Sequence, residues 1–279
     1  MLNKYFWLLL LSFLPLVLPG QTDGVDKVKW RSEKIAPGLV WRSAHTSFND
    51  TIPQNINILV LNNRKRNISL LYDPKKNIPT SEMASGAGSI AAVNAGFFNI
   101  KDGGSQTYIK ISGRIIDSDT ASKWPRVENM SGSVIIDPAG RISVMKAMRN
   151  GWYDSCSACR DALITGPLLL YQGKRARLPE TSIVLNRHPR TCIGITKKGT
   201  VILLTLDGRT DQSVGMTLVK LTDLMISLKC TDAVNLDGGG STTMWIRGKP
   251  FNGVVNMPCD NKKFDHDGER GVADILLIK

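Results

Sequence analysis

The residues best suited to chemistry lie in the segment Asp232–Trp245, which reads DAVNLDGGGSTTMW. Its apolar residues Ala233, Val234 and Leu236 are typical of a short buried strand, and three glycines follow directly. Glycines in a row pack nothing, so they indicate a backbone of unusual conformation or a close approach by a ligand. Asp237 stands between the strand and this loop, where it could act as an acid, base or nucleophile. A tight turn in which Asp237 bonds its own backbone explains the pattern equally well.

The loop after Asp237 predicts anion binding rather than a nucleophilic serine. The amides of Gly238, Gly239 and Gly240 could form a cradle for an anion, with Ser241 and Thr242 as hydrogen-bond donors. Ser241 misses the last glycine of the GxSxG elbow, and no lysine follows the glycines as in a P-loop.

A second group of candidates lies at the ends of a predicted hairpin. Cys192–Thr196 and Thr200–Leu206 are apolar runs separated by Lys197-Lys-Gly199. In an antiparallel pair the start of one strand lies beside the end of the other. We therefore expect Arg190 and Asp207 at one edge of the sheet, with Arg209 close by.

Asn94 and Gly96 follow a third apolar run, Ile90–Val93. The preceding Gly86-Ala-Gly88-Ser-Ile-Ala91 fits the dinucleotide fingerprint GxGxxA. That fingerprint needs a strand before it and a helix after it. Here the predicted strand comes after the glycines, so we reject a nucleotide site.

These segments together resemble the phosphodiester glycosidase family. The matching pieces run in the family's order over about residues 50–279: Asn94-Ala-Gly-Phe-Phe98, Gly166-Pro-Leu-Leu, Arg190-Thr-Cys-Ile-Gly-Ile195, Asp207-Gly-Arg209, Asp232–Trp245, Asn256-Met-Pro and Arg270. The resemblance implies that Asn94–Phe98 forms one wall of an active-site cleft, and it adds Asn256 and Arg270 to the substrate-binding candidates. It also implies cleavage between the anomeric carbon of a sugar and a phosphodiester oxygen.

The candidate residues suit that reaction. Glycoside hydrolysis usually needs two carboxyl groups, and Asp207 and Asp237 are the predicted catalytic pair. Arginine recognises phosphate through paired hydrogen bonds. A phosphomonoester is a much weaker base than an alkoxide, so it leaves with arginine neutralisation more than with a strong general acid. The predicted partner is a phosphorylated carbohydrate.

Two other functions stay open. One is a non-catalytic binder of phosphorylated envelope polysaccharide that uses the same arginines. The other is a metal-dependent phosphodiesterase that attacks phosphorus. A divalent cation at Asp207 or Asp237 stays open as the lesser alternative, because no ligand spacing supports it strongly. We expect no cofactor and no metal site.

The N-terminus predicts export. Lys4 precedes an apolar run from Tyr5 to Leu18, and Pro19-Gly20 follows. This pattern is typical of a secretory signal peptide over residues 1–20, and the run is short for a membrane span. We expect one phosphodiester glycosidase-like domain over residues 21–279, in the periplasm or outside the cell, without stable membrane insertion.

The charge of the chain favours anionic partners. The 279-residue chain has a formal net charge of +12, which falls to +11 without Lys4. No basic run or aromatic-basic interleaving predicts a nucleic-acid partner. The basic segment from Lys174 to Arg190 is either a solvated surface or an electropositive rim for phosphate.

The five cysteines all follow the predicted signal peptide. An exported chain favours disulfides, and the CxxC spacing of Cys156 and Cys159 favours a local one. No βαβ pattern or second CxxC accompanies it, so a zinc or redox role is the lesser alternative.

The predicted fold is a single α+β domain of mainly antiparallel sheets with few helices. Thr217–Leu228 carries leucine and methionine at helical spacing and should form the longest helix. A short helix with Ser81 as its N-cap is expected at Ser81–Ser85, and residues 146–165 are expected to be irregular. The predicted hairpins join Ile56–Leu61 to Ile68–Tyr72, and span Thr107–Ile116 and Ser133–Met145. Leu168–Tyr171, Ala233–Leu236 and Ile275–Ile278 are expected as single strands.

Overall fold

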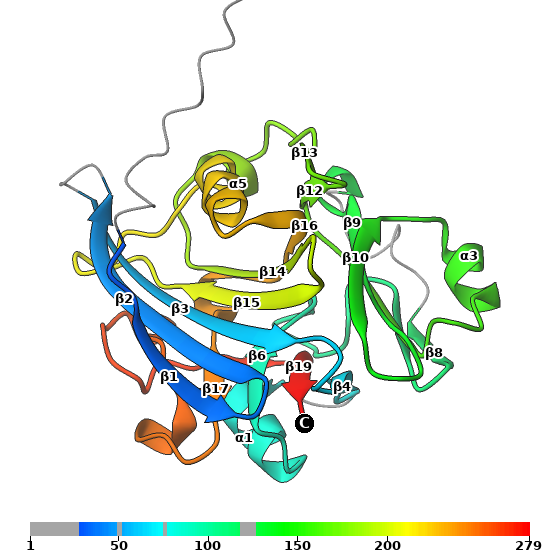
Figure 1. The fold of residues 1–279 in the computed structure, drawn as a ribbon, viewed down its shortest axis with the longest axis horizontal. Coiled ribbons are helices and arrows are strands. Elements are labelled where there is room, and N and C mark those ends of the chain that lie inside the picture. The colour runs from blue at the N-terminus through cyan, green and yellow to red at the C-terminus, as the bar shows by residue number, and fades with distance from the viewer. Residues whose placement is uncertain (1–27, 49–51, 75–76, 118–126) are drawn as a thin grey trace, which may run out of the picture.

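An eight-stranded antiparallel sheet forms the centre of the fold (Figure 1). The computed structural model describes residues 28–48, 52–74, 77–117 and 127–279, so the predicted signal peptide lies outside it. In order across the sheet the strands are β1 (Arg31–Ala36), β2 (Leu39–Phe48), β3 (Ile52–Asn62), β15 (Thr200–Leu206), β14 (Arg190–Thr196), β16 (Cys230–Asn235), β12 (Leu168–Tyr171) and β13 (Lys174–Arg175).

Three smaller sheets complete the β-structure. The five-stranded sheet has the order β10 (Ile142–Lys146), β9 (Gly132–Ile136), β11 (Asp161–Thr165), β7 (Ile109–Ile111) and β8 (Arg114–Asp117). The four-stranded sheet has the order β17 (Met244–Ile246), β6 (Ala91–Asn94), β19 (Asp274–Ile278) and β4 (Ile68–Tyr72). A short pair joins β18 (Gly271–Val272) to β5 (Ile78–Pro79).

The helices within the described residues are few and short. They are α1 (Thr80–Gly86), α3 (Asn150–Ser155), α4 (Ser182–Leu185) and α5 (Leu218–Ser227), with 3₁₀ turns η2 (Val127–Asn129), η3 (Gly239–Ser241) and η4 (Phe251–Gly253). Among these residues the strand pairings are antiparallel, so the predicted α+β class with mainly antiparallel sheets is confirmed. No helix in this part of the chain has the length and hydropathy needed to cross a membrane.

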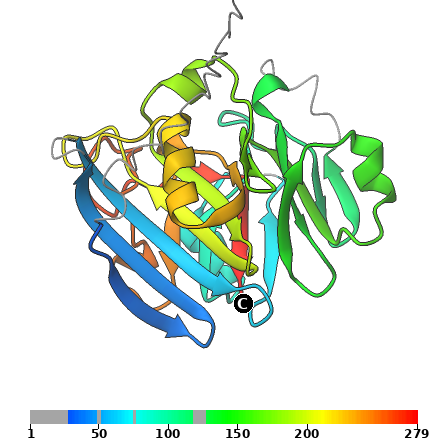
Figure 2. The same ribbon diagram turned by 45° about the horizontal axis from the view of Figure 1, so that its top comes forward.

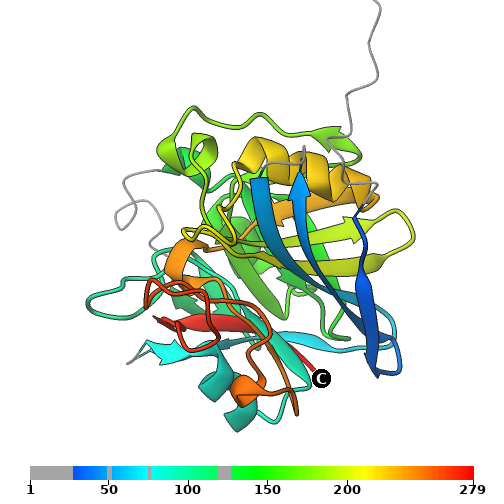
Figure 3. The ribbon, with the colours of Figure 1, turned by 90° about the vertical axis from the view of Figure 1, so that its left-hand side faces the viewer.

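The large sheet is packed on both faces. Leu218, Leu221 and Leu224 of α5 are buried in one cluster with side chains of β3, β14 and β15. The opposite face of the sheet packs against the four-stranded and five-stranded sheets. Figures 2 and 3 show α5 on one side of the large sheet, and Figure 3 shows β19 and α1 beyond the other.

Helix α5 confirms the predicted helix and its start. The Thr217 hydroxyl accepts a hydrogen bond from the Lys220 N–H at 3.3 Å, which satisfies one of the unpaired donors of the first turn. The buried stripe seen in the sequence faces the sheet, and the helix leads directly into β16.

Several predicted strands are also confirmed. The hairpins β7–β8, β9–β10 and β14–β15 form as expected, β12 has the predicted bounds, and β16 and β19 overlap the predicted strands. In β14–β15 the register pairs Arg190 with Leu206. Arg190 and Asp207 therefore lie at one edge of the sheet, as antiparallel pairing required.

The hairpin predicted between Ile56–Leu61 and Ile68–Tyr72 is wrong. Strand β3 lies between β2 and β15, so it has no free edge for β4. Residues after β3 cross to another sheet, where β4 pairs with β19. Asn63 fixes this crossing, because its side chain exchanges hydrogen bonds of 2.8 and 2.9 Å with the backbone of Ile142.

Two further predictions need correction. Residues 146–165 are not irregular throughout, since they contain α3 and the central strand β11. All five residues of β11 are buried, so the strand lacks the alternation that reveals a half-exposed one. Ser81 is not an N-cap, because α1 begins one residue earlier and its cap is Pro79. Instead Ser81 Oγ donates a 2.5 Å hydrogen bond to the Glu269 carboxylate.

Candidate active site

Asp237 lies at the end of β16, where the chain enters the glycine loop. Its N–H donates to the Ala95 carbonyl at 2.8 Å, and its own carbonyl accepts a 2.6 Å hydrogen bond from the Asn94 amide. The residue is half-buried, and burial raises the pKa of its carboxyl to about 6. Ser241, the Gly238 N–H, Arg270 and Arg209 act in the opposite direction and favour the ionised form. The structure thus gives the half-buried Asp237 a carboxyl whose pKa of about 6 lies close to neutrality.

The hydroxyl groups that follow the glycines are buried without partners. Among the described residues, Ser241 Oγ, Thr242 Oγ1 and Thr243 Oγ1 have no hydrogen-bond partner of ordinary geometry. Ser241 is nevertheless close enough to Asp237 to lower the pKa of that carboxyl. Unpaired buried hydroxyls cost about 1–3 kcal/mol each, so three in succession indicate groups kept for a ligand.

The glycine amides form a smaller cradle than the sequence indicated. The Gly239 N–H is already bonded to the Pro189 carbonyl at 3.0 Å, while the Gly238 N–H acts on the Asp237 carboxylate. Gly239 has a φ of +63°, and a Cβ there would lie 2.9 Å from Arg209 Nη2. A Cβ on Gly240 would lie 2.5 Å from Arg270 Nη2. These glycines are needed because two guanidinium groups cross the loop at close range.

The three arginines differ in what they contact. Arg209 is exposed, lies beside Gly239, and has no ion pair within the described part of the chain. Arg270 is paired with Asp260, with Nε 3.0 Å from Oδ1. Arg190 is buried, and its guanidinium donates to the carbonyls of Met216, Ile183 and Asn186 at 2.7–2.8 Å. Burial and Arg209 lower the pKa of Arg190 to about 9.

Asp207 has a buried carboxylate that is bonded to three donors. It is 1% exposed, and its carboxylate accepts hydrogen bonds from Asn55 at 2.6 Å, Asn256 at 2.8 Å and the Met257 N–H at 2.9 Å. Burial still raises the pKa of Asp207 to about 7, because these three hydrogen bonds only partly offset the desolvation. The carboxylate therefore fastens three segments of chain.

Asn94 and Asn256 are buried connectors. Asn94 Oδ1 accepts from Thr191 at 2.6 Å and from the Thr243 N–H at 3.1 Å. Asn256 accepts from the Met244 N–H at 2.7 Å and donates to Asp207 and to the Thr242 carbonyl. Both side chains position the Ser241–Thr243 loop.

The sequence analysis missed two residues of this region. Asn55 bonds Asp207, and Asp274 lies behind Gly96. A lone acid before the apolar Ile275–Leu277 was the available signal for Asp274, but its neighbour Gly96 is 178 residues away in sequence. Its oxygens would lie 3.0 Å from a Cβ at Gly96, which explains the glycine at that position.

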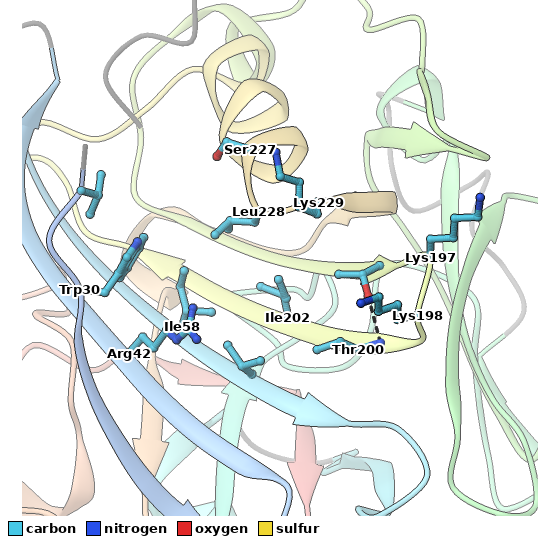
Figure 4. Close-up of a pocket in the computed structure, with 13 residues that line it drawn as sticks. Trp30, Arg42, Ile58, Lys197, Lys198, Thr200, Ile202, Ser227, Leu228 and Lys229 are labelled. Carbon is cyan, nitrogen blue, oxygen red and sulfur yellow. Dashed lines mark hydrogen bonds between the residues drawn. The ribbon is translucent and has the colours of Figure 1, made fainter. Parts of the chain in front are cut away.

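The first half of the basic segment from Lys174 to Arg190 lines a pocket that does not contain Asp237. Lys174, Arg175 and Arg177 border a pocket of about 720 Å³ beside β12 and β13, and Arg175 pairs with Asp223. A further pocket of about 590 Å³ lies between β3, β15 and the end of α5 (Figure 4). Lys197 and Lys198 line it at the turn of the β14–β15 hairpin, opposite the end that bears Asp207. Neither pocket contains a predicted site residue.

The disulfide predicted between two of the five cysteines is present. Cys156 and Cys159 form the expected disulfide, with an S–S distance of 2.05 Å. Cys192, Cys230 and Cys259 are buried free thiols. In the part of the chain that the structure describes, no group of three His, Cys, Asp or Glu side chains is placed to hold a metal ion.

The fold and the site define an antiparallel α+β protein with one half-buried carboxyl among unpaired hydroxyls and arginines. The chain belongs to the phosphodiester glycosidase family, whose match covers residues 87–279.

Relatives of the chain differ in their sequence identity to it and in the share of the chain that they match. The prophage-derived uncharacterized protein YomE of Bacillus subtilis is 38% identical over 93 residues, which is 33% of this chain and 13% of that protein. The N-acetylglucosamine-1-phosphodiester alpha-N-acetylglucosaminidase of Bos taurus is 25% identical over 195 residues, 67% of this chain and 36% of that protein. The chain thus spans about a third of the bovine protein's length.

Solved structures share the fold. The catalytic domain of zebrafish N-acetylglucosamine-1-phosphodiester alpha-N-acetylglucosaminidase, auto-inhibited by its pro-peptide, has a TM-score of 0.68 at 19% identity. The match covers 90% of this chain and 87% of that one. A hypothetical protein from Synechocystis has a TM-score of 0.65 at 13% identity, with 90% of this chain and 63% of that one covered.

Proposed function

We propose that the protein is an exported hydrolase that cleaves a sugar 1-phosphodiester between the anomeric carbon and the phosphodiester oxygen. Family membership and the activity named for the bovine relative support this reaction. The observation that carries it is the Asp237 carboxyl, on which Ser241, Arg270 and Arg209 act, at the start of a loop whose buried hydroxyls have no hydrogen bonds of ordinary geometry among the described residues.

Asp237 acts as the base or the nucleophile. As a base it takes a proton from water while the water oxygen bonds to the anomeric carbon and the carbon–oxygen bond to phosphate breaks. As a nucleophile it forms a glycosyl ester that water then hydrolyses. Either role needs the ionised form, and a pKa of about 6 leaves most of the carboxyl ionised at neutral pH.

Arg209 and Arg270 bind the phosphate that leaves. Both favour negative charge at Asp237, so they create a positive field at this point of the site. A leaving phosphomonoester is stabilised by that field without a strong general acid. A strong general acid is therefore unnecessary, and the three hydrogen bonds of Asp207 support a role in holding the loop.

The sugar takes the hydroxyl side of the site. Ser241, Thr242 and Thr243 offer hydroxyls that donate to or accept from sugar hydroxyls, and pairing them removes the cost of burying them unpaired. Export is supported by the signal-like residues 1–20 and by the Cys156–Cys159 disulfide, which suits an oxidising compartment.

The decisive pair of variants is Asp237→Asn and Asp207→Asn. With N-acetylglucosamine 1-(methyl phosphate) as substrate, Asp237→Asn should lose about 10²–10⁴-fold in kcat, with Tm and N-acetylglucosamine 1-phosphate binding retained. Asp207→Asn should lower Tm instead. Turnover near the wild-type rate in Asp237→Asn would refute the assignment. Binding without turnover in the wild type would favour the non-catalytic polysaccharide binder, and loss of turnover with chelators would favour the metal-dependent phosphodiesterase.

A further inference from the structure

A single peptide unit connects Asp237 to a second buried acid. The carbonyl of Ala95 accepts the Asp237 N–H at 2.8 Å, and the N–H of Gly96, in the same peptide, donates to Asp274 Oδ1 at 2.5 Å. Asp274 also holds the turn with its main chain, since its carbonyl accepts the Ala95 N–H at 3.3 Å. The position of Asp237 therefore depends on Asp274 through the Ala95–Gly96 peptide.

The Asp274 carboxyl is more than a backbone clamp. It is 1% exposed, and Oδ2 has no hydrogen-bond partner among the described residues. An asparagine would make the same bond to Gly96 without the cost of burying an ionisable group. Holding the turn with a buried carboxyl therefore costs more free energy than holding it with an amide. This difference indicates a role that uses the proton of the carboxyl.

The surroundings of Asp274 control that proton. Burial, with a smaller contribution from the negative charge of Asp237, raises the pKa of Asp274 to about 7, while the hydrogen bond from the Gly96 N–H acts in the opposite direction. The other titratable groups beside it are Tyr72, its partner in β4, and Asp73, which donates its N–H to the Ala273 carbonyl. Two nearby acids of this kind do not ionise together, so the proton is released from one before the other.

We propose that Asp274 is a positioning residue that holds Asp237 through the Ala95–Gly96 peptide and retains the one proton of this pair near neutral pH. This inference rests on the proposed function. While Asp274 is neutral, the Asp237–Asp274 pair carries one negative charge and the site accepts an anionic phosphodiester. Once Asp274 ionises, a second negative charge lies beside Asp237 and opposes substrate binding.

The test compares the pH profile of kcat/KM in the wild type and in Asp274→Asn, with N-acetylglucosamine 1-(methyl phosphate) as substrate. The wild-type profile should rise through about pH 6 as Asp237 ionises and fall from about pH 7 as Asp274 ionises. The asparagine keeps the bond to Gly96 but carries no charge, so the variant should keep the rise and lose the fall. A difference of about 10-fold at alkaline pH corresponds to one pKa unit of interaction.

Asp161→Asn is the matched control. Asp161 is another buried acid that accepts backbone N–H groups, from Ser112 at 2.8 Å and Leu70 at 3.2 Å, and it pairs with Arg160. Its loss should change Tm and leave the pH profile unchanged. The proposal is overturned if wild type and Asp274→Asn have superimposable profiles, or if the fall persists in the variant.

A second measurement separates this proposal from the proposed function. Binding of N-acetylglucosamine 1-phosphate, measured by calorimetry, should weaken above pH 7 in the wild type and not in Asp274→Asn, whether or not hydrolysis occurs. If the variant does not fold, a carbon-13 NMR titration of wild-type Asp274 decides. Titration near pH 7 that moves lower in Asp237→Asn supports the proposal, and titration at the ordinary value of an aspartate overturns it.

Discussion

Asn256 donates one amide hydrogen to Asp207 Oδ1 at 2.8 Å and the other to the Thr242 carbonyl at 3.0 Å. The buried carboxylate of Asp207 is thus joined through one side chain to the loop that bears the unpaired hydroxyls. The two acids predicted as a catalytic pair have different surroundings: Asp207 is enclosed by three donors, and Asp237 is only half-buried. On the proposed function, Asp207 supports the loop and Asp237 reacts.

Asp207→Asn should be destabilising although it conserves shape. All three partners of the carboxylate are donors, from Asn55, Asn256 and Met257. An asparagine presents an NH₂ group to at least one of them, which leaves buried donors facing each other. We expect a loss of about 1–3 kcal/mol in the free energy of unfolding, measured by urea denaturation. An unchanged midpoint and slope would show that the Asp207 network does not support the fold.

Arg190→Ala should lower stability, whereas Arg209→Ala should weaken substrate binding. Arg190 satisfies three backbone carbonyls, so its loss should cost ~3 kcal/mol or more of stability. Arg209 is exposed, so its loss should leave Tm unchanged and raise KM for a phosphodiester substrate about 10-fold or more. A neutral aryl glycoside of the same sugar is the control substrate, and equal losses on both substrates would contradict phosphate recognition by Arg209.

The loop hydroxyls should affect binding and not stability. Ser241→Ala and Thr242→Val remove buried oxygens that have no partner in the described chain, so Tm should stay constant or rise. KM should increase about 2–10-fold if each hydroxyl makes one hydrogen bond to the sugar. A lower Tm with unchanged KM would mean that these hydroxyls serve the fold.

Stability should fall as pH rises toward neutrality. The ordinary aspartate value is 3.8, and burial raises the pKa of Asp274 to about 7 in the folded protein. Between these values the folded state holds a proton that the unfolded chain releases, so the unfolding free energy decreases with pH and levels off above about 7. Urea denaturation at several pH values should show a steeper decline in the wild type than in Asp274→Asn. Parallel curves would contradict the raised pKa.

The sequence predicted those elements whose pattern is local. The Leu218–Met225 stripe determines α5, and the turn at Lys197–Gly199 sets the β14–β15 register that brings Arg190 beside Leu206. The roles of these residues needed the three-dimensional arrangement. Arginine type alone does not show that Arg190 would meet three carbonyls while Arg209 stays exposed.

Contacts between distant segments could not be predicted from one sequence. Asp274 meets Gly96 only because β19 pairs with β6, and the sequence contains no signal for that pairing. The same reason explains the false hairpin between β3 and β4, because the second partner of β3 is the distant β15 and the partner of β4 is the distant β19. Buried strand β11 was missed because both its faces are covered.

The bond that is cleaved is the most direct test of whether water attacks the anomeric carbon. Hydrolysis of N-acetylglucosamine 1-(methyl phosphate) in water labelled with oxygen-18 should give methyl phosphate without the label, because water attacks the anomeric carbon. The rate of this hydrolysis, measured with Asp237→Asn, should show the loss of turnover. Label in the methyl phosphate would place the attack at phosphorus and contradict cleavage at the anomeric carbon.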